Sequence, residues 1–143
     1  MAIIPARGGS KRIPRKNIRD FLGEPVISYS IRAALESGIF DEVMVSTEDD
    51  EIASLSNDFG ANVPFVRTHK NADDHASTMD VIPEVIHSYK ALGMQFQFAC
   101  CIYPRGPLVK PGRLIEGYEL LKRKGCDTVF PVVRFGYPIW RSL

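Results

Sequence analysis

Short apolar runs alternate along this chain with amphipathic segments of helical period, and this alternation restricts the fold more than any other feature. Runs typical of strands occupy residues 2–5, 42–47, 62–67, 98–103 and 128–133. Apolar residues at helical spacing predict helices over residues 25–37, 50–59, 78–92 and 111–124. Strands that alternate with helices over short connections build a parallel sheet covered by helices. The chain is therefore predicted to form a three-layer, doubly wound α/β fold with a mainly parallel, Rossmann-like sheet.

Two of the predicted strands carry features that bear on their place in the sheet. Pro64 lies within residues 62–67 and has no N–H to donate, which predicts an edge position or a bulge. The run at residues 98–103 is uniformly apolar, as expected for a strand that is buried on both faces. With 143 residues and no internal repeat or linker, the chain is predicted to be a single domain.

The loops that follow the strands are the expected place for a ligand, because open parallel sheets bind ligands at the carboxyl ends of their strands. This rule selects residues 6–17, 47–50, 67–80 and 104–111. The first of these loops (ARGGSKRIPRKN) is the most unusual, since it holds five basic side chains and no acid. The acidic run EDDE at residues 48–51 is instead typical of a helix start.

The loop at residues 6–17 has the composition of an anion site. Gly8 and Gly9 allow the backbone to approach a ligand closely, and successive N–H groups there can form a nest that the Ser10 hydroxyl supplements. Basic side chains add charge-assisted hydrogen bonds to phosphate oxygens. The loop matches neither the P-loop nor the dinucleotide fingerprint. Its residues favour a phosphate-bearing ligand, and the alternative is a solvated basic turn.

The distribution of charge narrows the class of partner. Residues 1–20 hold six basic groups and one acid, a net charge of +5, whereas the rest of the chain carries −4. A basic loop on a mildly acidic body, without interleaved aromatic residues, favours a small phosphate ligand over a nucleic acid. No apolar run approaches the roughly 18 residues of a membrane span, and no signal peptide is visible. We therefore expect no membrane partner and a cytoplasmic location.

Three long stretches of the sequence resemble a known protein family, which composition and charge alone do not indicate. They are IIPARGGSKRIPRKN at residues 3–17, FDEVMVSTEDDEIA at residues 40–53 and VPFVRTHKNADDHASTMDVI at residues 63–82. Together they resemble the acylneuraminate cytidylyltransferases, the CMP-sialic acid synthetase-like enzymes that transfer CMP from CTP to nine-carbon sialic-type acids. The segments ADDHAST, ACCIYP and PIWRSL are most similar to the pseudaminic acid branch, whose product serves flagellin glycosylation. The resemblance implies the nucleotide-diphospho-sugar transferase type of α/β fold, and a homodimer.

The resemblance places a CTP site on the loops after the first and third predicted strands and at the start of the third helix. The positions carried over are Ala6, Arg7, Gly8, Gly9, Ser10, Lys16, Asn17, Arg67, Ser77 and Thr78. Lys16 and Arg7 are the implied catalytic residues. A lysine near the α-phosphate would stabilise the charge that develops as the sugar oxygen attacks and pyrophosphate leaves. Asn17 offers both a donor and an acceptor, which suits a cytosine edge or a ribose.

Some of these residues also have a purely structural interpretation. Ser77 and Thr78 precede a helix, so either could be an N-cap, and Asp80 in the first turn suits the helix dipole. Residues 16–17, taken alone, could belong to a surface turn. The acids and histidine of residues 73–75 (DDH) are poorly spaced for a metal ion and are interpreted as loop residues.

The loop at residues 104–111 departs from the family pattern, which has small or hydroxylated residues between two prolines. This chain has Pro104-Arg105-Gly106-Pro107 instead. Arg105 could pair with the carboxylate of the sugar or could obstruct its pocket. Tyr103 holds the position at which sialic acid enzymes often carry a sugar-contacting glutamine. Tyr103 and Arg105 are therefore the predicted substrate residues, with pseudaminic acid as the favoured nonulosonic acid and sialic or legionaminic acid as alternatives.

The metal site of the family is the largest departure. The resemblance implies Mg²⁺ bound by a D-x-D segment near the C-terminus, and this chain contains no D-x-D. We therefore expect Mg²⁺ as the cofactor but no metal ligands in this chain. We also expect residues 1–143 to form a partial, C-terminally truncated cytidylyltransferase domain that is weakly active or inactive by itself. The alternatives are a nucleotide-binding remnant with little turnover and, much less favoured, a basic nucleic-acid binder.

Overall fold

The computed structural model describes residues 1–10, 13–72 and 76–134, and a parallel sheet lies at its centre. β1 (Ala2–Pro5) is the middle strand, between β4 (Val43–Ser46) and β5 (Cys100–Cys101). Ala2 is paired with Val43 on one side and with Cys100 on the other. Because all three strands are parallel, their carboxyl ends and the loops that follow them meet at one edge of the sheet.

Four α-helices of the described residues surround this sheet. They are α1 (Val26–Ser37), α2 (Asp50–Asp58), α3 (Thr78–Ala91) and α4 (Pro111–Lys124). The first and last residues of each helix lie within one residue of the predicted bounds. No helix in the described part of the chain is long and apolar enough to cross a membrane.

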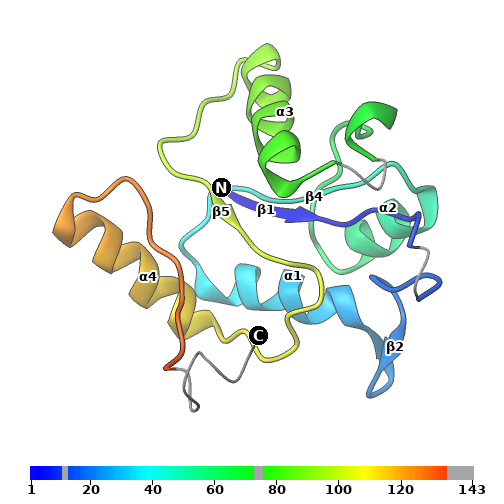
Figure 1. The fold of residues 1–143 in the computed structure, drawn as a ribbon, viewed down its shortest axis with the longest axis horizontal. Coiled ribbons are helices and arrows are strands. Elements are labelled where there is room, and N and C mark those ends of the chain that lie inside the picture. Colours follow the sequence, from blue (N-terminus) through cyan, green and yellow to red (C-terminus); the bar gives the residue numbers. More distant parts are fainter. Residues whose placement is uncertain (11–12, 73–75, 135–143) are drawn as a thin grey trace, which may run out of the picture.

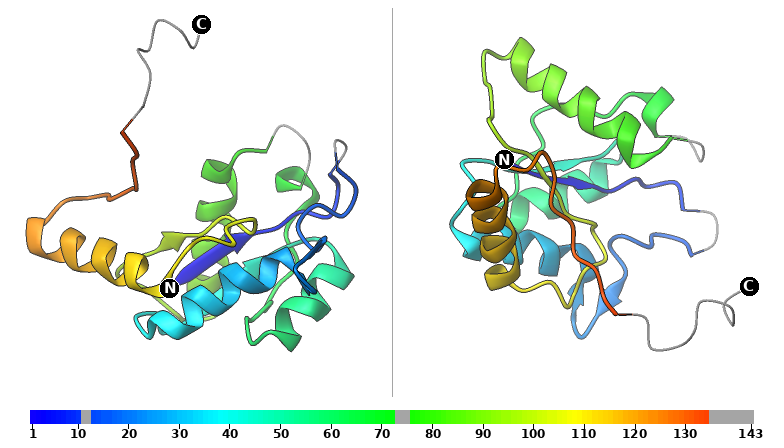
Figure 2. Two further views of the ribbon diagram at one scale, coloured as in Figure 1. Left: turned by 90° about the horizontal axis from the view of Figure 1, so that it is seen from below. Right: turned by 60° about the vertical axis from the view of Figure 1, so that its left-hand side comes forward.

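The helices cover both faces of the sheet because successive side chains of β1 point into two different apolar cores. Ala2 and Ile4 are fully buried against residues of α1 and α2, and Leu114 of α4 packs against the same cluster. Ile3 points the other way and packs against α3. Figures 1 and 2 show this arrangement, with α3 on one side of the sheet and α1 and α4 on the other. The predicted three-layer α/β fold with a parallel sheet is confirmed.

A small antiparallel hairpin, which was not predicted from the sequence, connects the loop after β1 to α1. It pairs β2 (Asp20–Phe21) with β3 (Glu24–Pro25). The turn residues Leu22 and Gly23 both have positive φ values, 56° and 89°. Leucine rarely adopts this conformation, so the residue types carried too weak a turn signal to reveal the hairpin.

Two of the predicted strands are wrong. Residues 62–67 make a single parallel bridge, between Asn62 and Met44, because Pro64 has no N–H with which to continue the ladder. Residues 128–133 form no strand either. Phe130 and Val133 are 73% and 91% exposed, and this segment leaves the body of the domain in the left view of Figure 2. Apolar residues form a strand only beside a pairing partner, and in the described sheet no strand pairs with them.

The strand predicted at residues 98–103 is shorter and more exposed than expected. Only Cys100–Cys101 pairs with β1, and both cysteines are half-buried. The expectation of burial on both faces is therefore wrong, and β5 lies at one edge of the described sheet. The helices cover it less completely than they cover the central strand β1.

Candidate nucleotide site

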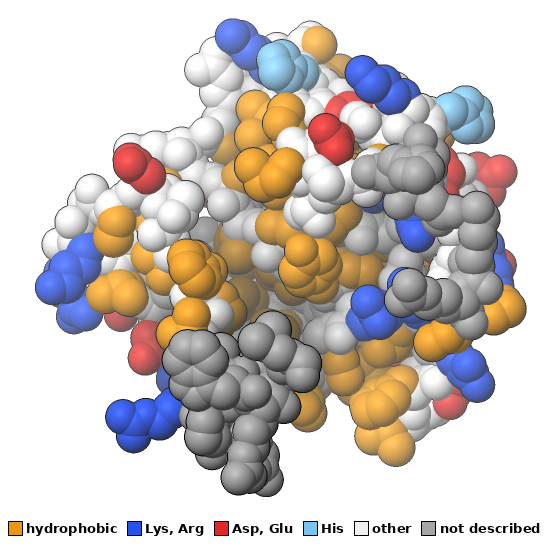
Figure 3. All heavy atoms as spheres, in the orientation of Figure 1, with side chains coloured by type: hydrophobic (Ala, Val, Ile, Leu, Met, Phe, Trp, Pro, Cys, Tyr) orange, Lys and Arg blue, Asp and Glu red, His pale blue; other side chains and the backbone are white. Residues whose placement is uncertain are grey.

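A cleft opens at the carboxyl edge of the sheet, where the loops after the strands meet the first turn of α3. Its volume is about 150 Å³. Its lining residues come from distant parts of the chain: Pro5, Arg7, Lys16, Asn17, Arg67, Asn71, Ala76, Ser77, Thr78, Val81, Tyr103, Pro104 and Arg105. On the face seen in Figure 3, hydrophobic side chains gather between α3 and α4, and basic side chains border them toward the end of β1. The lining of the cleft combines apolar residues with positive charge, which suits a ligand that carries both apolar and anionic groups.

Most of the residues predicted for CTP and sugar binding line this cleft. They are Arg7, Lys16, Asn17, Arg67, Ser77, Thr78, Tyr103 and Arg105. The predicted residues that do not line it are Ala6, Gly8, Gly9 and Ser10. Ala6 is fully buried, and its N–H donates to the Ser46 carbonyl at 2.9 Å. Residues 11–12, 73–75 and the PIWRSL segment lie outside the described residues, and the interpretation of residues 73–75 as loop residues stays a prediction.

Gly8 approaches the start of α2 rather than the cleft. Its N–H donates to Glu48 Oε1 at 2.7 Å, and the other oxygen of Glu48 is buried without a hydrogen-bond partner in the described part of the chain. A Cβ on Gly8 would lie 2.3 Å from Asp49 Oδ2, so no larger residue fits here without movement. The structure shows a close approach to the protein's own carboxylates, and the predicted approach of Gly8 to a ligand stays a prediction.

Arg15 is likewise bound to acids of the α2 region. Its guanidinium donates to both carboxylate oxygens of Asp49, at 2.5 and 3.0 Å, and also to Glu51. Asp49 is at the same time the N-cap of α2 and accepts from the Ile52 N–H at 3.0 Å. The hydrogen bonds from Arg15 and the Ile52 N–H lower the pKa of Asp49, although partial burial acts against them. The acidic run was correctly predicted to start a helix, but its role in holding the loop after β1 was missed.

Replacing Asp49 with alanine is expected to lower the free energy of unfolding by about 1–2 kcal/mol, since a helix cap is lost. Urea unfolding at pH 7 measures this, and Asp50→Ala, which removes the same charge from the same helix end, is the matched control. The depressed pKa of Asp49 fixes the sign of the pH effect. The difference between wild type and variant should persist at pH 5 and shrink as the pH falls below about 3.8, the ordinary value. An equal loss in Asp50→Ala would contradict a specific role of Asp49.

Asn17 closes the loop after β1 upon itself. Its side chain is 5% exposed, and Nδ2 donates to the Arg7 carbonyl at 2.8 Å. This bond joins the two ends of the basic loop and thereby holds Arg7 and Lys16 at the same wall of the cleft. Asn17 thus has a structural role in addition to the base or ribose contact that was predicted for it.

Arg67 contributes a buried positive charge to the cleft. It is 5% exposed, its Nε donates to Ser46 Oγ at 3.0 Å, and its guanidinium also donates to the Ser46 carbonyl. Burial lowers the pKa of Arg67, and the carboxylates of Glu48 and Glu84 act in the opposite direction. An arginine remains charged at neutral pH, and in a poorly solvated position its charge attracts an anion more strongly than it would in water.

The first turn of α3 forms the opposite wall. The Ser77 N–H and hydroxyl both donate to Asp80 Oδ2, at 2.8 and 2.7 Å, and these bonds lower the pKa of Asp80. The structural interpretation of Ser77 and Asp80 as a helix start is therefore confirmed. Thr78 Oγ1 lies 3.4 Å from the Tyr103 hydroxyl, so the wall continues into the loop after β5. A helix N-terminus beside the cleft adds a further preference for an anion.

Asn71 is a lining residue that the sequence reading missed. It lies in the 3₁₀ turn His69–Asn71, and its side-chain amide donates to Glu84 of α3. The signal was present in part, because residues 67–80 had been selected as a loop at the carboxyl edge of the sheet. A single asparagine in a loop does not indicate from its residue type that it lines a cleft.

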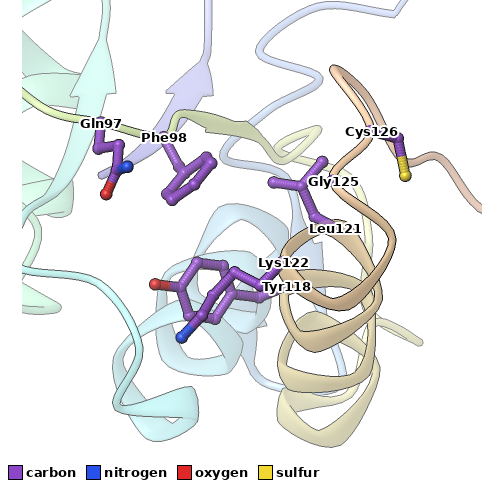
Figure 4. Close-up of a pocket in the computed structure, with 7 residues that line it drawn as sticks. All are labelled: Gln97, Phe98, Tyr118, Leu121, Lys122, Gly125 and Cys126. Atoms are coloured by element: carbon purple, nitrogen blue, oxygen red, sulfur yellow. The ribbon is translucent and has the colours of Figure 1, made fainter.

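A larger cavity, about 480 Å³, lies away from this cleft, beside α4 (Figure 4). Its lining includes Phe98, Tyr118 and Lys122, and in Figure 4 the rings of Phe98 and Tyr118 lie between α4 and the chain before β5. The Phe98 carbonyl accepts from the amino group of Met1, which places this cavity at the amino end of the strands. No predicted site residue lines it, whereas eight of them line the smaller cleft.

Comparison with known proteins gives a consistent picture. The sequence pattern of the family described as cytidylyltransferase matches residues 1–134. The pseudaminic acid cytidylyltransferase of Campylobacter jejuni subsp. jejuni serotype O:2 is 46% identical over 142 residues, which make up 99% of this chain and 61% of that protein. N-acylneuraminate cytidylyltransferase A of Danio rerio is 40% identical over 99% of this chain and 32% of its own length.

A solved structure shares the fold as well. CMP:2-keto-3-deoxy-manno-octonic acid synthetase complexed with CTP superposes with a TM-score of 0.73 at 26% identity, over 87% of this chain and 48% of that one. The chain thus spans 61% or less of the length of each of these three proteins. The match over residues 1–134 shows that the chain belongs to the cytidylyltransferase family.

Proposed function

We infer that the protein transfers CMP from CTP to a nonulosonic acid, with pseudaminic acid as the favoured acceptor. A hydroxyl oxygen of the sugar acid attacks the α-phosphorus, the bond to pyrophosphate breaks, and the hydroxyl proton passes to solvent. The observation that carries this proposal is the cleft at the carboxyl edge of the sheet. It brings Arg7, Lys16 and Arg67 to the same space as Tyr103 and Arg105.

The basic residues suit the triphosphate end of the ligand. Arg7 and Lys16 are held together by the Asn17 bond to the Arg7 carbonyl, and Arg67 adds a buried charge. Lysine and arginine near the reacting phosphate stabilise negative charge as it develops on the phosphoryl oxygens and on the leaving pyrophosphate. The N-terminal turn of α3 adds the Thr78 hydroxyl and the positive end of a helix dipole.

The loop after β5 suits the acceptor. Tyr103 is 65% exposed and Arg105 is also exposed, so both side chains are accessible to a ligand in the cleft. A guanidinium can hold a sugar carboxylate through two parallel hydrogen bonds. This favours the reading of Arg105 as a partner for the acceptor carboxylate over the reading in which it obstructs the pocket.

Magnesium is part of the proposal only as the metal that the family resemblance implies. In residues 1–10, 13–72 and 76–134, no group of three or more His, Cys, Asp or Glu side chains is placed to hold a metal ion. These residues do not by themselves fit a metal centre. The binding and charge-stabilising roles proposed for Arg7, Lys16 and Arg67 involve no metal ion. The homodimer, the cytoplasmic location and a use of the product in flagellin or cell-surface glycosylation stay predictions from the sequence.

Calorimetric titration with CTP, UTP, ATP and GTP tests the nucleotide part of the proposal. We expect CTP to bind at least tenfold more tightly than ATP or GTP, because a cleft of about 150 Å³ leaves less room for a purine base than for a pyrimidine. Pyrophosphate release with CTP and Mg²⁺ is then compared for pseudaminic, sialic and legionaminic acids. Faster turnover of sialic or legionaminic acid would identify that acid as the acceptor instead of pseudaminic acid. CTP binding without turnover of any of the three acids would indicate a nucleotide-binding remnant. Equal affinity for all four nucleotides would contradict the function.

A further inference from the structure

A single buried hydroxyl group bridges two backbone groups of the loop that follows β5. Ser30 lies in α1, on the far side of the sheet from α3, and its side chain is fully buried. Its Oγ donates to the Tyr103 carbonyl at 2.8 Å and accepts from the Gly106 N–H at 3.3 Å. One side chain therefore pairs with a backbone acceptor and a backbone donor of the same loop.

The loop itself is shaped to reach Ser30. A Cβ on Gly106 would lie 2.9 Å from Val109 Cγ2, 3.4 Å from the Tyr103 carbonyl oxygen and 3.5 Å from Ser30 Oγ. A side chain at this position would therefore press against the same contacts that tie the loop to α1. Tyr103 and Arg105 lie between the two tied backbone groups or at their border, and both line the cleft. The bridge thus fixes the backbone that carries the two predicted sugar contacts.

The other buried serines of α1 show what a purely structural serine does in this helix. Ser28 Oγ donates to Glu24 at 3.0 Å, and Ser37 Oγ donates to the Ala34 carbonyl of its own helix. Neither bond reaches the loop after β5. Ser30 differs because its partners are 73 and 76 residues away and belong to the wall of the cleft.

We propose that Ser30 is a positioning residue for the acceptor sugar: by tying the Tyr103 carbonyl and the Gly106 N–H, it sets the direction in which Tyr103 and Arg105 meet the nonulosonic acid. The inference rests on the proposed function, in which these two side chains contact the acceptor. Ser30 does not line the cleft, so it acts through the loop and touches no ligand. Its loss should therefore affect the two substrates unequally.

The test measures two affinities in the same protein by calorimetry. CTP is titrated into the metal-free protein, and pseudaminic acid is then titrated into the CTP-saturated protein, so that no turnover intervenes. In Ser30→Ala we expect the affinity for the acid to fall about tenfold, which corresponds to the loss of one or two hydrogen bonds. The affinity for CTP should change less than twofold. Ser28→Ala removes an equally buried hydroxyl from the same helix and should leave both affinities unchanged.

Three other results of these titrations would overturn the proposal. An unchanged affinity for the acid in Ser30→Ala, an equal loss for both ligands, or an equal loss in Ser28→Ala would overturn it. If Ser30→Ala does not give a cooperative thermal transition, Gly106→Ala shifts the same loop from its other side and must show the same selective loss. A wild-type protein that binds neither CTP nor the acid would refute the proposed function itself, and the inference with it. That failure is visible before any variant is compared.

Discussion

Replacing Lys16 with alanine should weaken CTP binding about 10- to 100-fold and abolish pyrophosphate release. Lys16 lies at the wall of the cleft beside Arg7, on the loop that Asn17 closes. Hydrogen bonds between a charged donor and a phosphate contribute about 1.5–3 kcal/mol each, which corresponds to this range of affinity. Because negative charge increases on the phosphoryl group during transfer, the effect on turnover should exceed the effect on binding. Calorimetric titration with CTP measures the change in affinity, and a pyrophosphate-release assay measures the change in turnover.

The matched control for this variant is Lys90→Ala. Lys90 is an exposed lysine in the last turn of α3, whereas the cleft borders the first turn of the same helix. A helix rises about 1.5 Å per residue, so the twelve residues from Thr78 to Lys90 separate this charge from the cleft by about 18 Å. Loss of CTP affinity in both variants would indicate a general effect of net charge. An unchanged affinity and turnover in Lys16→Ala would remove this lysine from the site.

Substitution of Arg67 is the second change with a large expected effect, since it should reduce both stability and CTP binding. In Arg67→Met the Ser46 hydroxyl loses its buried donor, and the Ser46 carbonyl loses one of two donors, since it still accepts from the Ala6 N–H. An unsatisfied buried polar group costs about 1–3 kcal/mol, and urea unfolding measures this loss. The cleft also loses its most deeply buried charge, so CTP affinity should fall at least about tenfold.

A lysine at the same position separates the two roles of Arg67. Arg67→Lys keeps a positive charge but loses the planar fork that reaches both Ser46 atoms. It should therefore be destabilised nearly as much as Arg67→Met while it retains more of the affinity for CTP. Arg113→Met is the control, because this arginine of α4 is 77% exposed and its removal should change stability by less than about 0.5 kcal/mol. Equal CTP affinity in Arg67→Met and the wild type would exclude Arg67 from the nucleotide site.

Local sequence pattern was sufficient to predict the fold class and the place of the site. The helical period of residues 25–37 and 78–92 and the apolar run at residues 2–5 predicted three elements that the structure contains. Parallel strands place the loops that follow them at one edge, so the meeting of Arg7 and Tyr103 at one cleft followed from topology alone, whereas Arg67 reaches the cleft from a segment that is not a strand. No contact between side chains had to be known for this step.

The failures arose where a residue's partner lies far away in the sequence. Arg15 was counted with the phosphate-binding charges, but its guanidinium is bound to Asp49, 34 residues later. Ser30 reads as one more small residue on an amphipathic helix, and its bond to the loop after β5 spans 73 residues. Residues 128–133 have the composition of a strand, but composition does not supply the neighbouring strand that such a segment needs.

The ties on the loop after β1 have a consequence for the entropy of binding. Asn17 is bonded to the Arg7 carbonyl, Gly8 to Glu48 and Arg15 to Asp49, so the described residues of this loop are already ordered when the protein has folded. A ligand that meets a preorganised loop does not have to immobilise it, and the conformational entropy that would oppose binding was lost during folding instead. A weak set of contacts to a nucleotide can then yield a useful affinity, because little of their free energy is consumed in arranging the loop that makes them.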